Sequence, residues 1–131
     1  MIDYMHQLGI EPIITMNHYE TPINITLKYG GWPNKQVIPM FEKFAKTLLD
    51  RYGSKVKYWI VVNQINMVQI EPWLSVGVTS DQYDNEEQAL YQAMHNQFVG
   101  AAWAKQYAKS LHNPNLHIGT MAVSYTHLTL P

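Results

Sequence analysis

Residues 58–63 read YWIVVN, an apolar run that ends in an amide side chain and is followed by the polar residues Gln64 and Asn66. A short apolar run rich in β-branched residues is typical of a strand that is buried on both faces. Strands of this kind belong to parallel sheets, because helices cover both faces of such sheets. The stretch therefore predicts a central strand, and it is the strongest strand prediction in the chain.

Two further runs of the same character flank this strand. Residues 12–17 (PIITMN) and 117–123 (HIGTMAV) also combine apolar and β-branched residues. Between the runs, residues 37–52 and 86–111 carry apolar side chains at helical spacing. Turn residues dominate most of the remaining segments, which are predicted to be loops. The order of the elements predicts alternating strands and helices, as in β/α proteins.

The ends of the predicted helices carry recognisable signals. Ile2, Met5 and Leu8 are spaced three apart and precede Gly9, which indicates the last turns of a helix closed by a glycine. Asn85 precedes the last helix and is a preferred N-cap residue. The helices are therefore predicted with defined ends.

Three parallel strands with covering helices fit a small doubly wound sheet or part of a (β/α)8 barrel, which needs about 250 residues to close. No glycine-rich phosphate-binding sequence follows any of the runs, which disfavours a dinucleotide-binding fold. Polar residues gather instead at 17–20 and 63–66, and barrels carry their active sites where strands end. The expected fold class is α/β: a partial (β/α)8 TIM barrel of about three strand-helix units, an internal piece of a larger protein.

Composition narrows the range of partners. Of the 131 residues, 47% are apolar and 15% are charged, which is typical of a globular protein. A net charge of -1 without a cluster of Lys and Arg argues against nucleic acid and anionic membranes as partners. No apolar stretch approaches the roughly 20 residues needed to span a bilayer. The histidines lack ligand spacing, so no metal site is expected.

Four segments, taken in order and spacing, resemble glycoside hydrolase family 1: residues 9–12 (GIEP), 18–22 (HYETP), 29–32 (YGGW) and 57–66 (KYWIVVNQIN). Within the family the chain is most similar to bacterial 6-phospho-β-glucosidases. The resemblance implies a piece of a cytoplasmic, retaining β-glycosidase that hydrolyses 6-phospho-β-glucosides and needs no cofactor.

The resemblance covers residues 1–122, which are expected to form a partial barrel domain. Residues 123–131 do not continue the pattern and are interpreted as foreign sequence, with a divergent loop as the alternative.

A retaining glycosidase needs a carboxylate nucleophile and a carboxylic acid that protonates the leaving oxygen. The resemblance assigns the acid/base position to Gln64, where a glutamine replaces the family's glutamate. Its amide can donate a hydrogen bond but does not titrate near neutral pH. Gln64 is either a retained position with altered chemistry, as in plant thioglucosidases, or the mark of a lost acid or a sequence error. The nucleophile is expected outside this chain.

The resemblance also implies that His18, Tyr19 and Asn63 bind the sugar. Without it, His18 would be interpreted as a packed histidine and Tyr19 as an equally plausible packing residue. Glu71 is a weaker candidate for a surrogate acid. An unphosphorylated β-glucosidase or β-galactosidase and a non-catalytic sugar-binding homologue remain alternatives, and the isolated chain is expected to be inactive. The sequence predicts no oligomeric state.

Overall fold

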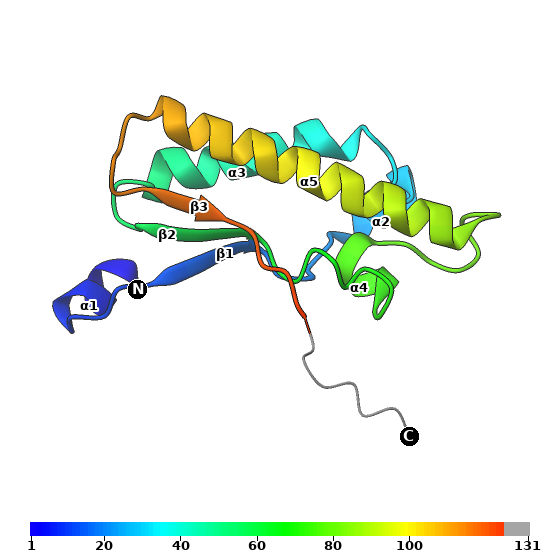
Figure 1. Ribbon diagram of the computed structural model, residues 1–131, viewed down its shortest axis with the longest axis horizontal. Coiled ribbons are helices and arrows are strands. Elements are labelled where there is room, and N and C mark those ends of the chain that lie inside the picture. Colours follow the sequence, from blue (N-terminus) through cyan, green and yellow to red (C-terminus); the bar gives the residue numbers. More distant parts are fainter. Residues whose placement is uncertain (125–131) are drawn as a thin grey trace, which may run out of the picture.

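The computed structural model describes residues 1–124 and contains one sheet of three parallel strands. The strands are β1 (Ile13–Asn17), β2 (Tyr58–Val62) and β3 (His117–Gly119), in the order β1-β2-β3. All three run in the same direction, as Figure 1 shows. The predicted parallel alternation of strands and helices is confirmed.

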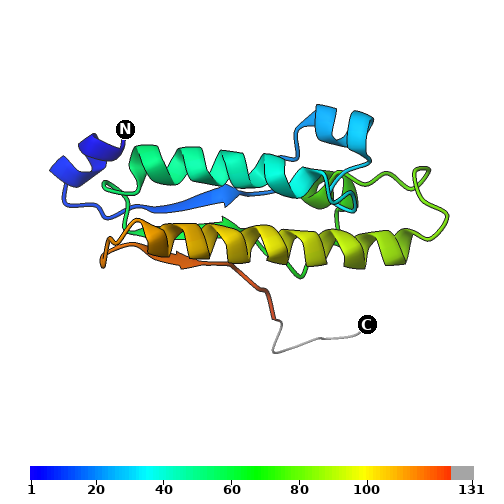
Figure 2. The ribbon, with the colours of Figure 1, turned by 90° about the horizontal axis from the view of Figure 1, so that it is seen from above.

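Five helices connect or precede the strands: α1 (Ile2–Gln7), α2 (Ile23–Tyr29), α3 (Val37–Tyr52), α4 (Pro72–Val76) and α5 (Glu86–Ser110). The long helices α3 and α5 lie side by side over one face of the sheet (Figures 1 and 2). No helix within residues 1–124 is long and apolar enough to cross a membrane.

The opposite face of the sheet is not covered by a helix within the described residues (Figure 1). Ile13 is 64% exposed and Tyr58 is 42% exposed. The Tyr58 ring stacks on that of His117, with the ring centroids 5.2 Å apart. The prediction that β1 and β2 are buried on both faces is therefore wrong at Ile13 and Tyr58, although Val62, on the same face as Tyr58, is only 2% exposed.

The core lies between the sheet and the two long helices. α3 buries one residue in each turn, and the buried residues are Val37, Phe41, Ala45 and Leu49. α5 meets α3 through small residues, and a Cβ atom added to Gly100 would lie only 2.9 Å from the Phe41 ring. This close approach explains why the buried stripe of α5 is rich in Ala and Gly.

The predicted helix ends are confirmed. The N–H of Gly9 donates to the carbonyl of His6 at 3.0 Å, and the N–H of Ile10 donates to that of Met5 at 2.9 Å. With Gly9 at a φ of 73°, this is the glycine-terminated pattern expected after α1. Asn85 caps α5, because its side chain accepts the N–H of Gln88 at 3.0 Å.

Two short helices lie in segments that the sequence predicts to be loops. α2 follows Pro22 and ends at Gly30, and α4 begins with Pro72 and ends at Gly77. Both glycines have left-handed φ values, as is usual after a helix. The turn-forming residues therefore delimit helices too short to show apolar periodicity.

Two other expectations need correction. Phe44 and Phe98 belong to the apolar residues of the predicted helices 37–52 and 86–111 but are 46% and 45% exposed, because each lies at the edge of the buried stripe of its helix. Strand β3 ends at Gly119 rather than at residue 123. The predicted tail, residues 123–131, lies outside the described residues from 125 onward.

Candidate active site

The predicted site residues follow β1 and β2 at the carboxyl end of the sheet. The backbone N–H of Asn63 donates to the carbonyl of Asn17 at 2.9 Å, so the two strand ends lie next to each other. His18 and Tyr19 come directly after β1, and Gln64 comes after Asn63. The fold thus brings the residues singled out in the sequence to neighbouring positions.

Gln64 is the point at which these segments meet. Its side-chain oxygen accepts a hydrogen bond from the Tyr19 hydroxyl and one from the Asn63 amide, the latter at 3.4 Å. Because both contacts use the oxygen, the NH2 group of Gln64 is the part of the side chain left to donate to other groups. Gln64 also has a φ of 44°, an uncommon value for a residue with a side chain.

The segment after β1 is shaped by a second left-handed residue. Tyr19 has a φ of 74°, and its ring lies edge-on to that of His18 with centroids 5.5 Å apart. The carboxylate of Glu20 accepts the backbone N–H of His18 at 3.1 Å. His18 is exposed, Tyr19 is half-buried, and Asn63 is only 4% exposed.

The segment after β2 is also bonded to the chain beyond β3. The N–H of Ile65 donates to the carbonyl of Met121 at 2.9 Å, and the N–H of Met121 donates to that of Val62 at 3.1 Å. The Asn66 side chain donates to the carbonyl of Val123 at 2.7 Å and accepts the Val123 N–H at 2.8 Å. This pairing of Asn66 was not predicted, because no local sequence pattern signals it.

Buried amide side chains of α5 hold the loops behind the site. Asn96 donates to the carbonyls of Trp32 and Pro33 at 2.7 and 3.0 Å, and Gln97 donates to that of Ser75 at 3.2 Å. Asn96 and Gln97 are 1% and 2% exposed. One helix thereby fixes both the loop after β1 and the loop after β2.

Two other carboxylates, Glu11 and the surrogate-acid candidate Glu71, lie apart from this arrangement. Glu11 precedes β1 at the opposite end of the sheet and contacts Lys57 Nζ at 2.5 Å, a hydrogen bond that lowers the pKa of Glu11. Glu71 is exposed and precedes α4. Within residues 1–124, no three His, Asp or Glu side chains come together in a way that could hold a metal ion.

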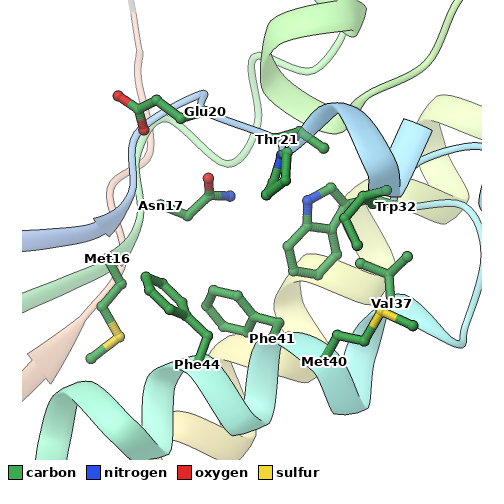
Figure 3. Close-up of a pocket in the computed structure, with 11 residues that line it drawn as sticks. Met16, Asn17, Glu20, Thr21, Trp32, Val37, Met40, Phe41 and Phe44 are labelled. Carbon is green, nitrogen blue, oxygen red and sulfur yellow. The ribbon is translucent and has the colours of Figure 1, made fainter. Parts of the chain in front are cut away.

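A cavity of about 320 Å³ lies beside the site, between the end of β1, α2 and α3 (Figure 3). Its walls are mainly apolar, with the Trp32, Phe41 and Phe44 rings on one side and Glu20 extending away from them. Asn17 lines the cavity, whereas His18, Tyr19, Asn63 and Gln64 do not. The cavity is therefore separate from the predicted sugar-binding residues.

Comparison with known proteins yields one family. The sequence profile of glycosyl hydrolase family 1 matches residues 1–130. A 6-phospho-beta-glucosidase of Clostridium longisporum is 40% identical over 121 residues, which cover 92% of this chain and 25% of that protein. An aryl-phospho-beta-D-glucosidase of Bacillus subtilis is 40% identical over 128 residues, which cover 96% of this chain and 27% of that protein. The chain spans about a quarter of the length of these curated relatives.

Solved structures give the same fold. A family 1 β-glucosidase from Thermotoga maritima matches with a TM-score of 0.69 and 29% identity, over 83% of this chain and 24% of that one. A rice β-glucosidase mutant in a covalent complex with glucose matches with a TM-score of 0.73 and 28% identity, over 83% of this chain and 25% of that one. The expected fold class, part of a (β/α)8 barrel, is confirmed.

Proposed function

The chain belongs to glycosyl hydrolase family 1, and from this premise we propose that the whole protein is a retaining β-glycosidase that hydrolyses 6-phospho-β-glucosides. Two relatives about 40% identical to the chain carry names that specify phosphorylated β-glucosides, which supports this substrate class. The proposal rests above all on the contact of Tyr19 with Gln64 beside Asn63, where two strands end. In a (β/α)8 barrel the substrate binds at this end of the strands.

In this proposal His18 and Asn63 hold hydroxyl groups of the sugar, and Tyr19 lines the pocket. An imidazole and a carboxamide each donate and accept hydrogen bonds, as a sugar hydroxyl requires. His18 is exposed at the end of β1 and available to a ligand. Asn63 is buried and its amide is oriented toward Gln64, so its contact with the sugar would lie close to the scissile bond.

Gln64 sets the chemistry of the first step. A carboxylate nucleophile, supplied from outside this chain, forms a bond to the anomeric carbon while the bond to the leaving oxygen breaks. The Gln64 amide donates a hydrogen bond to that oxygen but transfers no proton, so the leaving group departs as an anion and later takes a proton from water. Substrates with acidic leaving groups should therefore react fastest.

The substrate proposal is tested with nitrophenyl and dinitrophenyl β-glucosides, each with and without a 6-phosphate. We expect the whole protein to prefer the phosphorylated member of each pair, and the dinitrophenyl leaving group over nitrophenyl. Equal rates for both members of a pair would exclude specificity for phosphorylated sugars and favour an ordinary β-glucosidase. A preference for β-galactosides would favour the β-galactosidase alternative.

A non-catalytic sugar-binding protein is the second candidate, because Gln64 removes the proton donor while His18 and Asn63 could still hold a ligand. The two candidates differ in turnover of the dinitrophenyl substrate. Hydrolysis of that substrate supports the enzyme. Saturable binding of a 6-phosphoglucoside, measured by calorimetry, without any hydrolysis supports the binding protein.

The proposal includes a cytoplasmic location, because a sugar phosphate carries roughly -1.5 to -2 charges and does not cross a bilayer unaided. The isolated 131-residue chain is proposed to be inactive. β1 and β3 each pair on one side only within the described residues, and Ile13 is 64% exposed on the uncovered face. Unpaired strand edges and exposed apolar faces promote aggregation.

A further inference from the structure

We propose that Asn66 is a positioning residue for the side chain at position 64, a role that rests on the proposed function and on residue 123 belonging to the native chain, as in the divergent-loop interpretation of residues 123–131. The carboxamide of Asn66 bonds both backbone groups of Val123, donating to its carbonyl at 2.7 Å and accepting its N–H at 2.8 Å. These are the two groups that Val123 would offer to a neighbouring strand. Asn66 thus uses its side chain in the place of a paired strand residue.

The pairing occurs where the regular ladder between β2 and β3 has ended. Register pairing stops at Ile60 opposite Gly119. Beyond it, the Thr120 hydroxyl and the Met121 N–H both donate to the carbonyl of Val62, at 2.8 and 3.1 Å. The chain after β3 therefore stays beside the turn after β2. The bonds of the Asn66 side chain to Val123 are the last of these contacts along the chain.

Gln64 lies inside the segment that is held in this way. Its neighbours are fixed on opposite sides: the Asn63 N–H donates to the Asn17 carbonyl, and the Ile65 N–H donates to the Met121 carbonyl, both at 2.9 Å. A φ of 44° is costly for glutamine and persists only when the surroundings enforce it. Loss of the Asn66 bonds to Val123 would remove one of the contacts that hold the chain after β3 beside this turn, and so loosen the turn that keeps Gln64 in contact with Tyr19.

The test compares Asn66→Ala with Asn113→Ala in the whole protein. Asn113 is a matched control, because its side chain donates to the Gly53 carbonyl at 3.1 Å and accepts the Asn115 N–H at 3.0 Å. It therefore makes the same two kinds of backbone bond at the opposite end of the sheet. The readouts are amide hydrogen exchange of peptides covering 63–67, and kcat and KM on nitrophenyl 6-phospho-β-glucoside, whose poorer leaving group depends more on the hydrogen bond from Gln64.

For Asn66→Ala we expect exchange in 63–67 to rise about tenfold and kcat to fall about tenfold with little change in KM, as the loss of two hydrogen bonds implies. Asn113→Ala should leave all three values unchanged. Asn66→Asp keeps the acceptor for the Val123 N–H and should give intermediate values, and it serves as the test if Asn66→Ala does not fold.

Unchanged exchange in both Asn66 variants overturns the positioning role, as does an equal fall in kcat for Asn113→Ala. If the unmodified protein hydrolyses no phosphoglucoside, the proposed function fails. The exchange measurement still decides whether Asn66 holds the turn at Gln64.

Discussion

The hydroxyl of Tyr19, which follows β1, donates a hydrogen bond to the side-chain oxygen of Gln64, which follows β2. Both residues have left-handed backbone conformations. Within residues 1–124 only one other non-glycine residue, His112, shares this feature. Such conformations cost of order 1–3 kcal/mol and cluster at functional sites. Their meeting at the carboxyl end of two neighbouring strands supports the location of the proposed site.

Replacement of Gln64 by Glu is expected to supply the missing proton donor. For phosphoglucosides with poor leaving groups, kcat/KM should rise by about 10²- to 10⁴-fold, the usual contribution of general acid catalysis. For dinitrophenyl 6-phospho-β-glucoside it should change little, because that leaving group needs no proton. The measurement is the dependence of kcat/KM on the leaving-group pKa, which should become shallower in Gln64→Glu.

Gln64→Asn is the matched control for this substitution. It keeps an amide but is one methylene shorter, so it should gain nothing with any leaving group. A rise in rate that is uniform across leaving groups in Gln64→Glu would contradict a role in proton transfer.

The sequence was sufficient to predict the parallel fold because each strand is a compact apolar run. The long helices were equally clear, since α3 carries apolar residues at helical spacing and Asn85 caps α5. α2 and α4 were missed because seven and five residues are too few for that spacing to appear. Their boundary residues, such as Pro22 and Gly77, are the same residue types that form turns.

The sequence predicted that the candidate residues are neighbours, but not how they contact one another. That polar residues after β1 and β2 would be neighbours follows from parallel pairing. The contact between Tyr19 and Gln64 does not, because it depends on two left-handed backbone conformations that no residue type requires. The role of Asn66 depends on where β3 stops pairing, which the apolar run 117–123 conceals.

Asn96→Ala should destabilise the whole protein by about 2–3 kcal/mol. The substitution removes donors to the buried carbonyls of Trp32 and Pro33 and leaves them without these partners. Urea unfolding followed by tryptophan fluorescence measures the change. The control is Gln106→Ala at an exposed position of the same helix, which should stay within about 0.5 kcal/mol of the unmodified protein. Equal stability of both variants would show that Asn96 does not hold the loop.

Gly31→Ala should cost more stability than Gly9→Ala, although both glycines have left-handed φ values, 84° and 73°. A Cβ atom at position 31 would lie 2.4 Å from the Val76 carbonyl oxygen, whereas nothing lies within 4 Å of one at position 9. Gly9→Ala therefore measures the backbone cost alone, about 1 kcal/mol. Any additional loss of stability in Gly31→Ala then reports the steric clash with the end of α4. Equal losses of stability in the two variants would contradict that close contact.

Tyr107→Phe should narrow the pH range of maximal stability. The Tyr107 hydroxyl accepts from Lys46 at 2.8 Å and donates to Asp50 at 2.5 Å, and Lys46 also binds Asp50 at 2.6 Å.

The hydrogen bond from Lys46 lowers the pKa of Asp50, and the bond to Asp50 together with the one to Tyr107 raises the pKa of Lys46 to about 12. The contribution of ionised Asp50 to folding stability is fully present above its ordinary pKa of 3.8 and is lost as the pH falls through the lowered pKa. The stability contribution of charged Lys46 is complete below its ordinary pKa of 10.5 and is lost as the pH rises through about 12.

The difference in Tm between the unmodified protein and Tyr107→Phe should therefore be largest between these two limits and shrink beyond each of them. Phenylalanine keeps the ring that stacks on Trp103 with a centroid separation of 5.2 Å, so only the hydroxyl contacts are removed. Thermal unfolding across the pH range measures the effect. A Tm difference that does not change with pH would show that the hydroxyl acts independently of the charges on Lys46 and Asp50.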